Sequence, residues 1–138
     1  MLSDDSLFAE TTKETLANWS RPDYPYPSTP LALLKSWKAM IEICKKGYQD
    51  NISEYDNDLS IREAIELVLS SERSKEYPEF TEFLEKVNRL DEEFSEFLQT
   101  DITRSEYANW WLQRAPKYGC AELADDFFQI YGIRITVV

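Results

Sequence analysis

The sequence contains no histidine, and it is poor in glycine, cysteine and long apolar runs. Histidine is the usual general base near neutral pH and the commonest ligand of transition metals, so its absence argues against most enzymatic chemistry of those kinds. The three glycines, Gly47, Gly119 and Gly132, are too few for an architecture of tight hairpins or phosphate-binding loops. This scarcity favours helices.

The two cysteines, Cys44 and Cys120, match no metal-binding or redox spacing. Two isolated cysteines are typical of a reducing compartment, which predicts a cytoplasmic protein. The sequence holds no apolar run of the roughly 18 residues that a membrane span needs. Its first ten residues, MLSDDSLFAE, have neither the basic region nor the apolar run of a signal peptide. We therefore expect no membrane association.

The composition is that of one globular domain spanning residues 1–138, because 43% of the residues are hydrophobic and 14% are aromatic. The net charge is −11, from 26 acidic and 15 basic residues. Such a chain repels nucleic acid, whose phosphates require cations, and it repels anionic membranes. It attracts basic surfaces. The alternative interpretation of the charge is solubility alone.

The strongest pattern lies in residues 78–98, PEFTEFLEKVNRLDEEFSEFL. Apolar residues recur there at steps of three and four, which predicts one long amphipathic helix with Pro78 at its first position. The apolar stripe consists of Phe80, Phe83, Leu84, Val87, Leu90, Phe94, Phe97 and Leu98. Glutamates occupy most of the other side. The helix therefore has a core-forming face and an acidic outer face.

Further helices are predicted from caps and periodicity. A first helix covers residues 1–19, with its regular part beginning at the capping box of Thr11 and Glu14. A helix over 30–46 is capped by Ser28 or Thr29 and ends at Gly47. Its predicted apolar stripe consists of Leu31, Leu34, Trp37, Ile41 and Cys44, widened by Leu33, Met40 and Ile43. Residues 48–59 hold at most a short helical turn. The others are a helix from the capping box of Ser60 and Glu63, one from that of Thr103 and Glu106 to residue 114, and one over 121–131 ending at Gly132.

Two segments are predicted not to be helical. Residues 21–29, RPDYPYPST, contain three prolines and are expected to form an ordered connector. Residues 133–138, IRITVV, are β-prone but have no evident partner strand, so they form an extended tail that packs on the domain or pairs with another chain. The predicted fold is all-α, an irregular bundle of about six helices around the long central helix 78–98.

Several residue patterns resemble reactive sites. Carboxylates at i,i+3 spacing, Glu63–Glu66, Glu82–Glu85, Glu93–Glu96 and Glu122–Asp125, have the spacing with which all-α nucleotide pyrophosphatases hold Mg²⁺. They are scattered and lack a basic phosphate-binding complement. Asp56-Asn57-Asp58 resembles the start of a calcium loop but lacks the glycine and glutamate that follow in one. Neither cysteine has a histidine to activate it. We expect no catalytic residue, metal ligand or cofactor.

The remaining candidates are protein-binding residues. Tyr107, Trp110 and Arg114 share one face of the predicted helix, and these residue types dominate binding hot spots. Alternatively, Trp110 packs beneath a neighbouring loop. A second group consists of carboxylates that form a docking face for a cationic partner: Asp56, Asp58, Glu92, Glu93 and Glu96.

The sequence therefore predicts a non-enzymatic, acidic interaction module that binds a basic protein. Its composition is similar to that of immunity proteins that neutralise basic toxins, so an immunity-type inhibitor is one form of this hypothesis. Two alternatives remain open. One is a carboxylate- and Mg²⁺-dependent all-α hydrolase acting on nucleotides. The other is an oligomeric structural module in which residues 133–138 pair between subunits.

Overall fold

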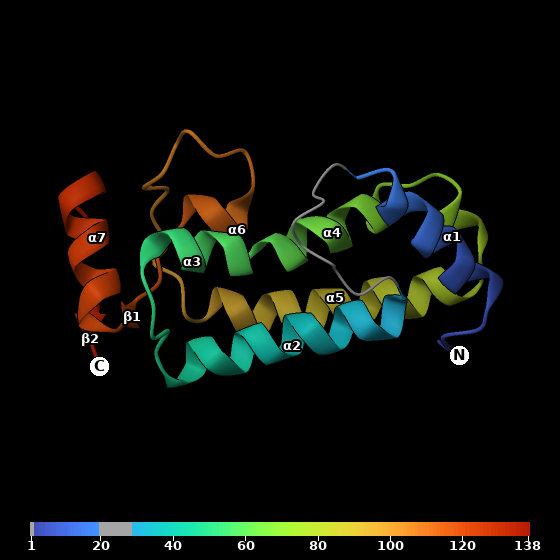
Figure 1. Cartoon of the computed structure of the whole chain (residues 1–138), viewed down its shortest axis with the longest axis horizontal. Helices are drawn as coiled ribbons and strands as arrows, with labels where there is room; N and C mark the ends of the chain where they lie inside the picture. The colour runs from blue at the N-terminus through green and yellow to red at the C-terminus, as the bar shows by residue number, and fades with distance from the viewer. Residues whose placement is uncertain (1, 20–28) are drawn as a thin grey trace. The chain divides into compact units, whose positions relative to one another are not determined.

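The computed structural model describes residues 2–19 and 29–138, so all of the predicted connector 21–29 except Thr29 lies outside the described residues. Helix accounts for 62% and strand for 5% of the described residues, which confirms the all-α class. The elements in chain order are α1 (Leu7–Ala17), α2 (Pro30–Lys46), α3 (Ile52–Asp58), α4 (Ser60–Leu69), the 3₁₀ turn η1 (Ser74–Glu76), α5 (Glu79–Ser95), α6 (Trp110–Gln113), β1 (Tyr118–Gly119), α7 (Ala121–Tyr131) and β2 (Thr136–Val137) (Figure 1).

The chain divides into two compact units. Unit 1 comprises residues 1–39 and 60–90, and unit 2 comprises residues 40–59 and 91–138. Helices α2 and α5 contribute residues to both units. The expectation of one domain over residues 1–138 stays a prediction. No helix of the described residues is long and apolar enough to cross a membrane.

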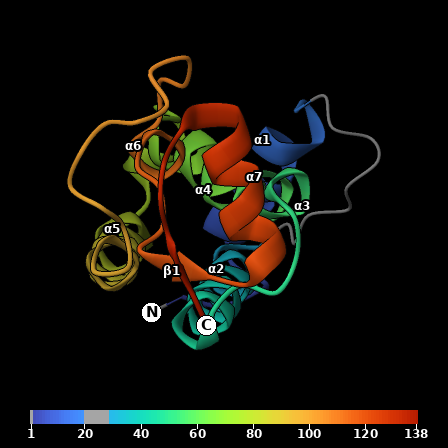
Figure 2. The same cartoon turned by 90° about the vertical axis from the view of Figure 1, so that its left-hand side faces the viewer.

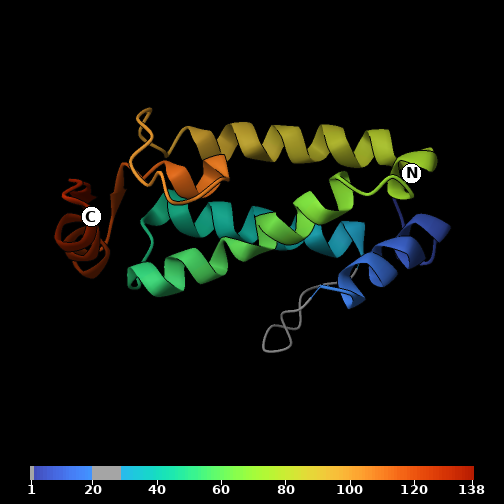
Figure 3. The ribbon, with the colours of Figure 1, turned by 90° about the horizontal axis from the view of Figure 1, so that it is seen from above.

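In unit 1, α1 packs against α4 and η1, and Figure 3 shows α1 alongside α4. Phe8 is the buried anchor of α1, with its ring centroid 5.8 Å from those of Tyr77 and Phe83. The predicted start at Thr11 is wrong. Ser6 caps the helix by accepting a hydrogen bond from the Ala9 amide at 3.0 Å. Thr11 lies within α1, where its side chain is buried and shares a hydrogen bond of 2.6 Å with the Tyr77 hydroxyl.

The predicted boundaries of α2 are confirmed. Thr29 accepts a hydrogen bond from the Ala32 amide at 3.3 Å, Pro30 is the first helical residue, and Gly47 follows the last one. Its buried side chains follow the predicted apolar stripe; they are Leu33, Leu34, Trp37, Met40, Ile41 and Cys44. Ile43, expected to widen that stripe, is 47% exposed. Residues 52–58, where only a short turn was expected, form the two-turn helix α3, capped by Asn51.

The long helix is confirmed as α5, Glu79–Ser95. Four residues of its predicted stripe are fully buried, namely Phe83, Val87, Phe94 and Leu98, the last just beyond the helix end. The remaining stripe positions are half-buried. The burial of Phe83, Val87 and Phe94 on this helix stabilises the fold by about 1.5–3 kcal/mol for each side chain.

The prediction of a helix from the capping box of Thr103 and Glu106 to residue 114 is wrong over most of that segment. Residues 96–109 form a loop in unit 2, drawn in orange in Figure 1, and α6 is a single turn. The amides of Thr103 and Arg104 donate to the Gln113 carbonyl at 2.9 and 3.1 Å, which closes the loop on α6. The loop conformation places the Arg104 side chain inside unit 2, where it is 1% exposed. Tertiary contacts thus override the local helical signal.

The end of α7 is confirmed. Gly132 adopts a left-handed conformation with φ of 69°, and the Ile133 amide donates to the Phe127 carbonyl at 3.3 Å. The tail does have a partner strand within the chain, contrary to the sequence-based expectation. β2 pairs in parallel with β1, in the register Tyr118 to Thr136 and Gly119 to Val137. Figure 2 looks onto α7 with β1 and the C-terminal segment beside it.

Candidate functional site

The interior of unit 2 contains a charged and aromatic cluster centred on Arg104. Its two terminal nitrogens donate to the two carboxylate oxygens of Asp56, at 2.9 and 2.5 Å. A third hydrogen bond reaches the Leu112 carbonyl at 3.3 Å. The guanidinium carbon lies 4.5 Å from the ring centroid of Tyr107, 5.4 Å from that of Phe127 and 5.1 Å from that of Tyr131. Arg104 therefore connects the loop, α3 and α7.

The electrostatics of this cluster favour a permanently charged Arg104. Burial works to lower the pKa of Arg104, but its hydrogen bonds to Asp56 and Tyr131 raise that pKa overall. At the rim, the Tyr131 hydroxyl donates to Glu106 at 2.7 Å, which lowers the pKa of the Glu106 carboxyl. Burial and the same bond raise the pKa of Tyr131. The cluster is a fixed ion pair with an aromatic shell, which suits positioning rather than proton transfer.

The acidic residues predicted from α3 are both engaged inside unit 2. Asp56 holds Arg104, and Asp58 accepts a hydrogen bond from the Tyr48 hydroxyl at 2.6 Å. Burial and the bond to Asp58 raise the pKa of Tyr48. Both aspartates are half-buried. Their first role is therefore to hold α3 against its neighbours.

The predicted aromatic group is only partly brought together. Tyr107 lies in the loop against Arg104, with its hydroxyl 3.5 Å from Asp56. Trp110 is half-buried at the start of α6, with its ring centroid 6.3 Å from that of Phe94 and 5.7 Å from that of Trp111. Arg114 donates to the carbonyls of Gln99 and Leu98 at 2.7 and 3.4 Å. The three residues do not form one row on a helix, because residues 103–109 are not helical.

The predicted glutamates lie at the end of α5. Glu92 and Glu96 are exposed. Glu93 forms an ion pair with Lys45 at 3.0 Å, and Lys45 also contacts Glu42 at 3.3 Å. The hydrogen bonds to Glu93 and Glu42 raise the pKa of Lys45. Glu92 and Glu96 therefore present carboxylates to solvent, whereas Glu93 already has a cationic neighbour.

The two units differ strongly in charge. Unit 2 contains 14 acidic and 6 basic residues, for a net charge of −8, whereas unit 1 contains 12 and 9, for a net charge of −3. One of the six cations of unit 2, Arg104, is buried and neutralised by Asp56. The negative charge of the chain is thus concentrated in the unit that contains all the predicted binding residues.

The placement of the acidic side chains and of Cys44 bears on metal binding and on thiol reactivity. The described residues include no group of three or more cysteine, aspartate and glutamate side chains placed to hold a metal ion. Cys44 is buried, and burial followed by the proximity of Asp58 raises the pKa of its thiol to about 12. A thiol with that pKa is protonated near neutral pH and is a poor nucleophile.

Comparison with known proteins returned no match to a family model, to a curated protein or to a solved structure. We therefore infer the function from the residues themselves. The sequence pattern did not identify Arg104, because its acidic partner lies 48 residues earlier and its neighbours Thr103 and Ser105 indicate a helix start.

Proposed function

We propose that this chain is a non-enzymatic, cytoplasmic interaction protein whose unit 2 binds a basic protein. The observation that carries the proposal is the charge distribution, −8 in unit 2 against −3 in unit 1. Charge of one sign on one part of a molecule steers an oppositely charged partner toward that part and raises its association rate. A charge serving solubility alone has no reason to collect in one unit.

The binding surface would combine exposed carboxylates with a half-buried aromatic side chain. Glu92 and Glu96 supply the carboxylates, and Trp110, whose ring centroid lies 6.3 Å from that of Phe94, supplies the aromatic side chain; all three belong to unit 2. Tryptophan is among the residues that contribute most to binding energy in protein interfaces. An immunity-type inhibitor is the specific form of this proposal, in which the carboxylates cover a cationic site on a toxin.

The interior of unit 2 supports a rigid binding surface. The ion pair of Arg104 with Asp56 and the bond of Tyr48 to Asp58 fix α3 and the loop 96–109 by charge-assisted contacts. A rigid surface loses less conformational entropy on binding than a flexible one. The two aspartates then act as supports, and the exposed glutamates as the contacting groups.

The test begins with affinity capture on the immobilised chain, identification of the captured protein, and its purification. Its dissociation constant is then measured for the wild-type chain, for Glu92→Lys/Glu96→Lys, and for the control Glu76→Lys/Glu85→Lys. The two double variants change the net charge equally, but the control changes exposed residues of unit 1. We expect at least ten-fold weaker binding for the unit 2 variant and less than three-fold for the control. Equal effects, or capture of no basic protein, would refute the proposal.

A further inference from the structure

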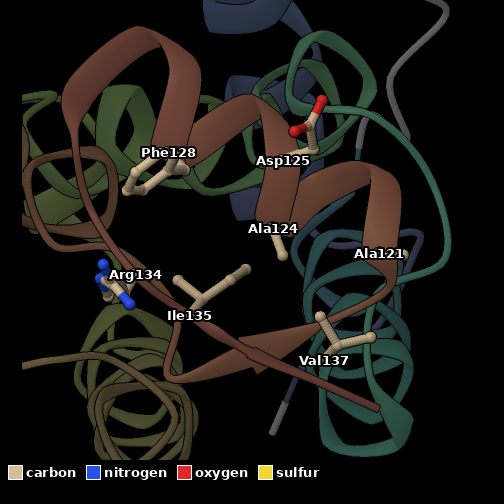
Figure 4. Close-up of a pocket in the computed structure, with 7 residues that line it drawn as sticks. All are labelled: Ala121, Ala124, Asp125, Phe128, Arg134, Ile135 and Val137. Carbon is tan, nitrogen blue, oxygen red and sulfur yellow. The ribbon is translucent and has the colours of Figure 1, made fainter.

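An open groove lies between α7 and the C-terminal strand of unit 2. Its volume is about 440 Å³, and it is lined by Ala121, Ala124, Asp125, Phe128, Arg134, Ile135 and Val137. Figure 4 shows Ala124 and Ile135 directed toward each other across the groove, with Arg134 at one end. Phe128 is 47% exposed and Val137 is 57% exposed. Two alanines on the helix leave the space that larger side chains would fill.

The strand that borders this groove has one paired edge and one unpaired edge. The amides of Thr136 and Val138 donate to the carbonyls of Lys117 and Gly119, each at 2.9 Å. Successive backbone groups along a strand point to opposite sides. The N–H and C=O groups of Ile135 and Val137 therefore point away from β1, and they have no partner among the described residues. The other edge of β1 is covered, because the Cys120 amide donates to the Tyr48 carbonyl at 2.9 Å.

We infer that this groove binds an extended segment of a basic partner protein, which adds a strand to the unpaired edge of β2. This inference rests on the proposed function and names the mode of contact. Strand addition beside a helix supplies backbone hydrogen bonds for affinity, and alternate side chains enter the groove for specificity. Ala121, Ala124, Phe128 and Ile135 make the groove apolar, so the entering side chain is aliphatic.

Charge identifies a partner rather than a second copy. Asp125 and Glu122 are exposed on α7 beside the groove, in a unit with a net charge of −8. A second copy would bring the same negative charge against them, which is unfavourable. A segment that alternates aliphatic and basic residues meets both the apolar groove and its acidic surroundings. The guanidinium of Arg134 lies 5.5 Å from the Phe128 ring centroid at one end of the groove. At that end a basic residue of the partner segment is disfavoured, because the two positive charges repel each other.

The experiment uses the full chain, ¹⁵N-labelled, titrated with the synthetic peptide Lys-Val-Lys-Val-Lys-Val-Lys. We expect the largest NMR shifts in residues 121–128 and 134–138, and slower hydrogen exchange of the Val137 amide. A peptide of the same sequence with alternate backbone nitrogens methylated should bind at least ten-fold more weakly, because it cannot extend the sheet. The glutamate analogue of the peptide should not bind. Shifts confined to other regions, or equal binding of the methylated peptide, would overturn the inference.

Two pairs of variants locate the binding in the groove. Ala124→Phe fills it and should weaken peptide binding at least ten-fold, whereas Gln129→Phe, at an exposed position of α7 outside the lining, should not. Val137→Pro removes only an outward amide and should weaken binding about five-fold relative to Val137→Ala. If all four variants bind equally, the groove is not the site.

The natural partner distinguishes this inference from the proposed function. If Ala124→Phe leaves the affinity for that partner unchanged while Glu92→Lys/Glu96→Lys weakens it, the groove inference fails and the proposed function stands. If neither variant changes the affinity, both fail. Sedimentation of the chain alone supplies the remaining outcome, since a dimer that dissociates in Ala124→Phe would assign the groove to a second copy and overturn the inference.

Discussion

Replacing Arg104 by methionine should destabilise the fold by about 3 kcal/mol. The substitution keeps an unbranched apolar side chain in place but removes the cation. The Arg104 side chain is 1% exposed and the Asp56 side chain is 24% exposed, so in this variant water only partly replaces the cation as the partner of the Asp56 carboxylate. Breaking a buried ion pair costs about 3–5 kcal/mol, and the partial exposure of Asp56 places the expected value at the lower end.

The reciprocal change, Asp56→Asn, leaves the guanidinium buried without its counter-charge and should cost a similar amount, about 3 kcal/mol. Because the two residues share one interaction, the double variant should be less destabilised than the sum of the singles. We expect a coupling energy of about 2 kcal/mol in the double-mutant cycle.

The assay is urea unfolding followed by circular dichroism, with Lys45→Met as the control. Lys45 forms its ion pair with Glu93 at the surface, where both side chains are about 40% exposed, so its removal should leave the unfolding midpoint nearly unchanged. A loss below about 1 kcal/mol for Arg104→Met, or additive single effects, would show that the cluster does not hold unit 2 together.

Three further predictions concern stability. Burial raises the pKa of the Cys44 thiol to about 12 in the folded state, so the stability that this thiol contributes is complete below the unfolded-state pKa of 9.0 and is lost as pH rises. At pH 10 the free energy of unfolding should therefore be lower than at pH 7 by about 1.4 kcal/mol from this thiol. Cys44→Ala should flatten this pH dependence, whereas the control Cys120→Ala should not. The Tyr55 hydroxyl is buried without a hydrogen-bond partner among the described residues, so Tyr55→Phe should raise the free energy of unfolding by about 1 kcal/mol. A decrease of that size would show instead that the hydroxyl has a partner. Gly132→Ala should cost about 1 kcal/mol through its left-handed φ alone, since no atom lies within 4 Å of the added Cβ, and Gly132→Asn should cost less; equal stability of all three would be contrary to this reasoning.

The sequence predicted those helices whose boundary signals and core face agree. For α2, Thr29, Pro30 and Gly47 mark the ends and the apolar stripe marks the buried side, and the structure follows both. The apolar stripe of α5 likewise marks its buried side, although the helix ends at Ser95 rather than at the predicted residue 98. The left-handed glycine after α7 is confirmed. In these elements the local signals and the tertiary packing favour the same structure.

The errors arose where distant contacts decide the local structure. The capping-box pattern at Thr103 and Glu106 predicted a helix, but the contacts of Arg104 with Asp56 and the rings of α7 hold that segment as a loop. The pairing of the tail with β1 was missed because a two-residue strand at Tyr118 and Gly119 has no periodicity to detect. A Cβ at position 119 would lie 2.8 Å from Cδ2 of Leu123 in α7, so a larger residue there requires that side chain to shift.

The candidate binding residues were predicted by type but not by arrangement. Exposed glutamates at the end of α5 follow directly from the amphipathic pattern, and Glu92 and Glu96 are exposed. The grouping of Tyr107, Trp110 and Arg114 depended on a helix that is not formed. The concentration of charge in unit 2 required knowledge of which segments pack together, because its residues come from two separate parts of the chain.

The most direct test of the central claim is the association rate constant of the purified basic partner at 50 and 300 mM salt. If the charge of unit 2 steers that partner, the wild-type rate should fall at least ten-fold between the two conditions, and Glu92→Lys/Glu96→Lys should reduce both the rate and its salt dependence. The control Glu76→Lys/Glu85→Lys should retain most of both. A rate that is insensitive to salt, or equally affected by the two double variants, would contradict the account.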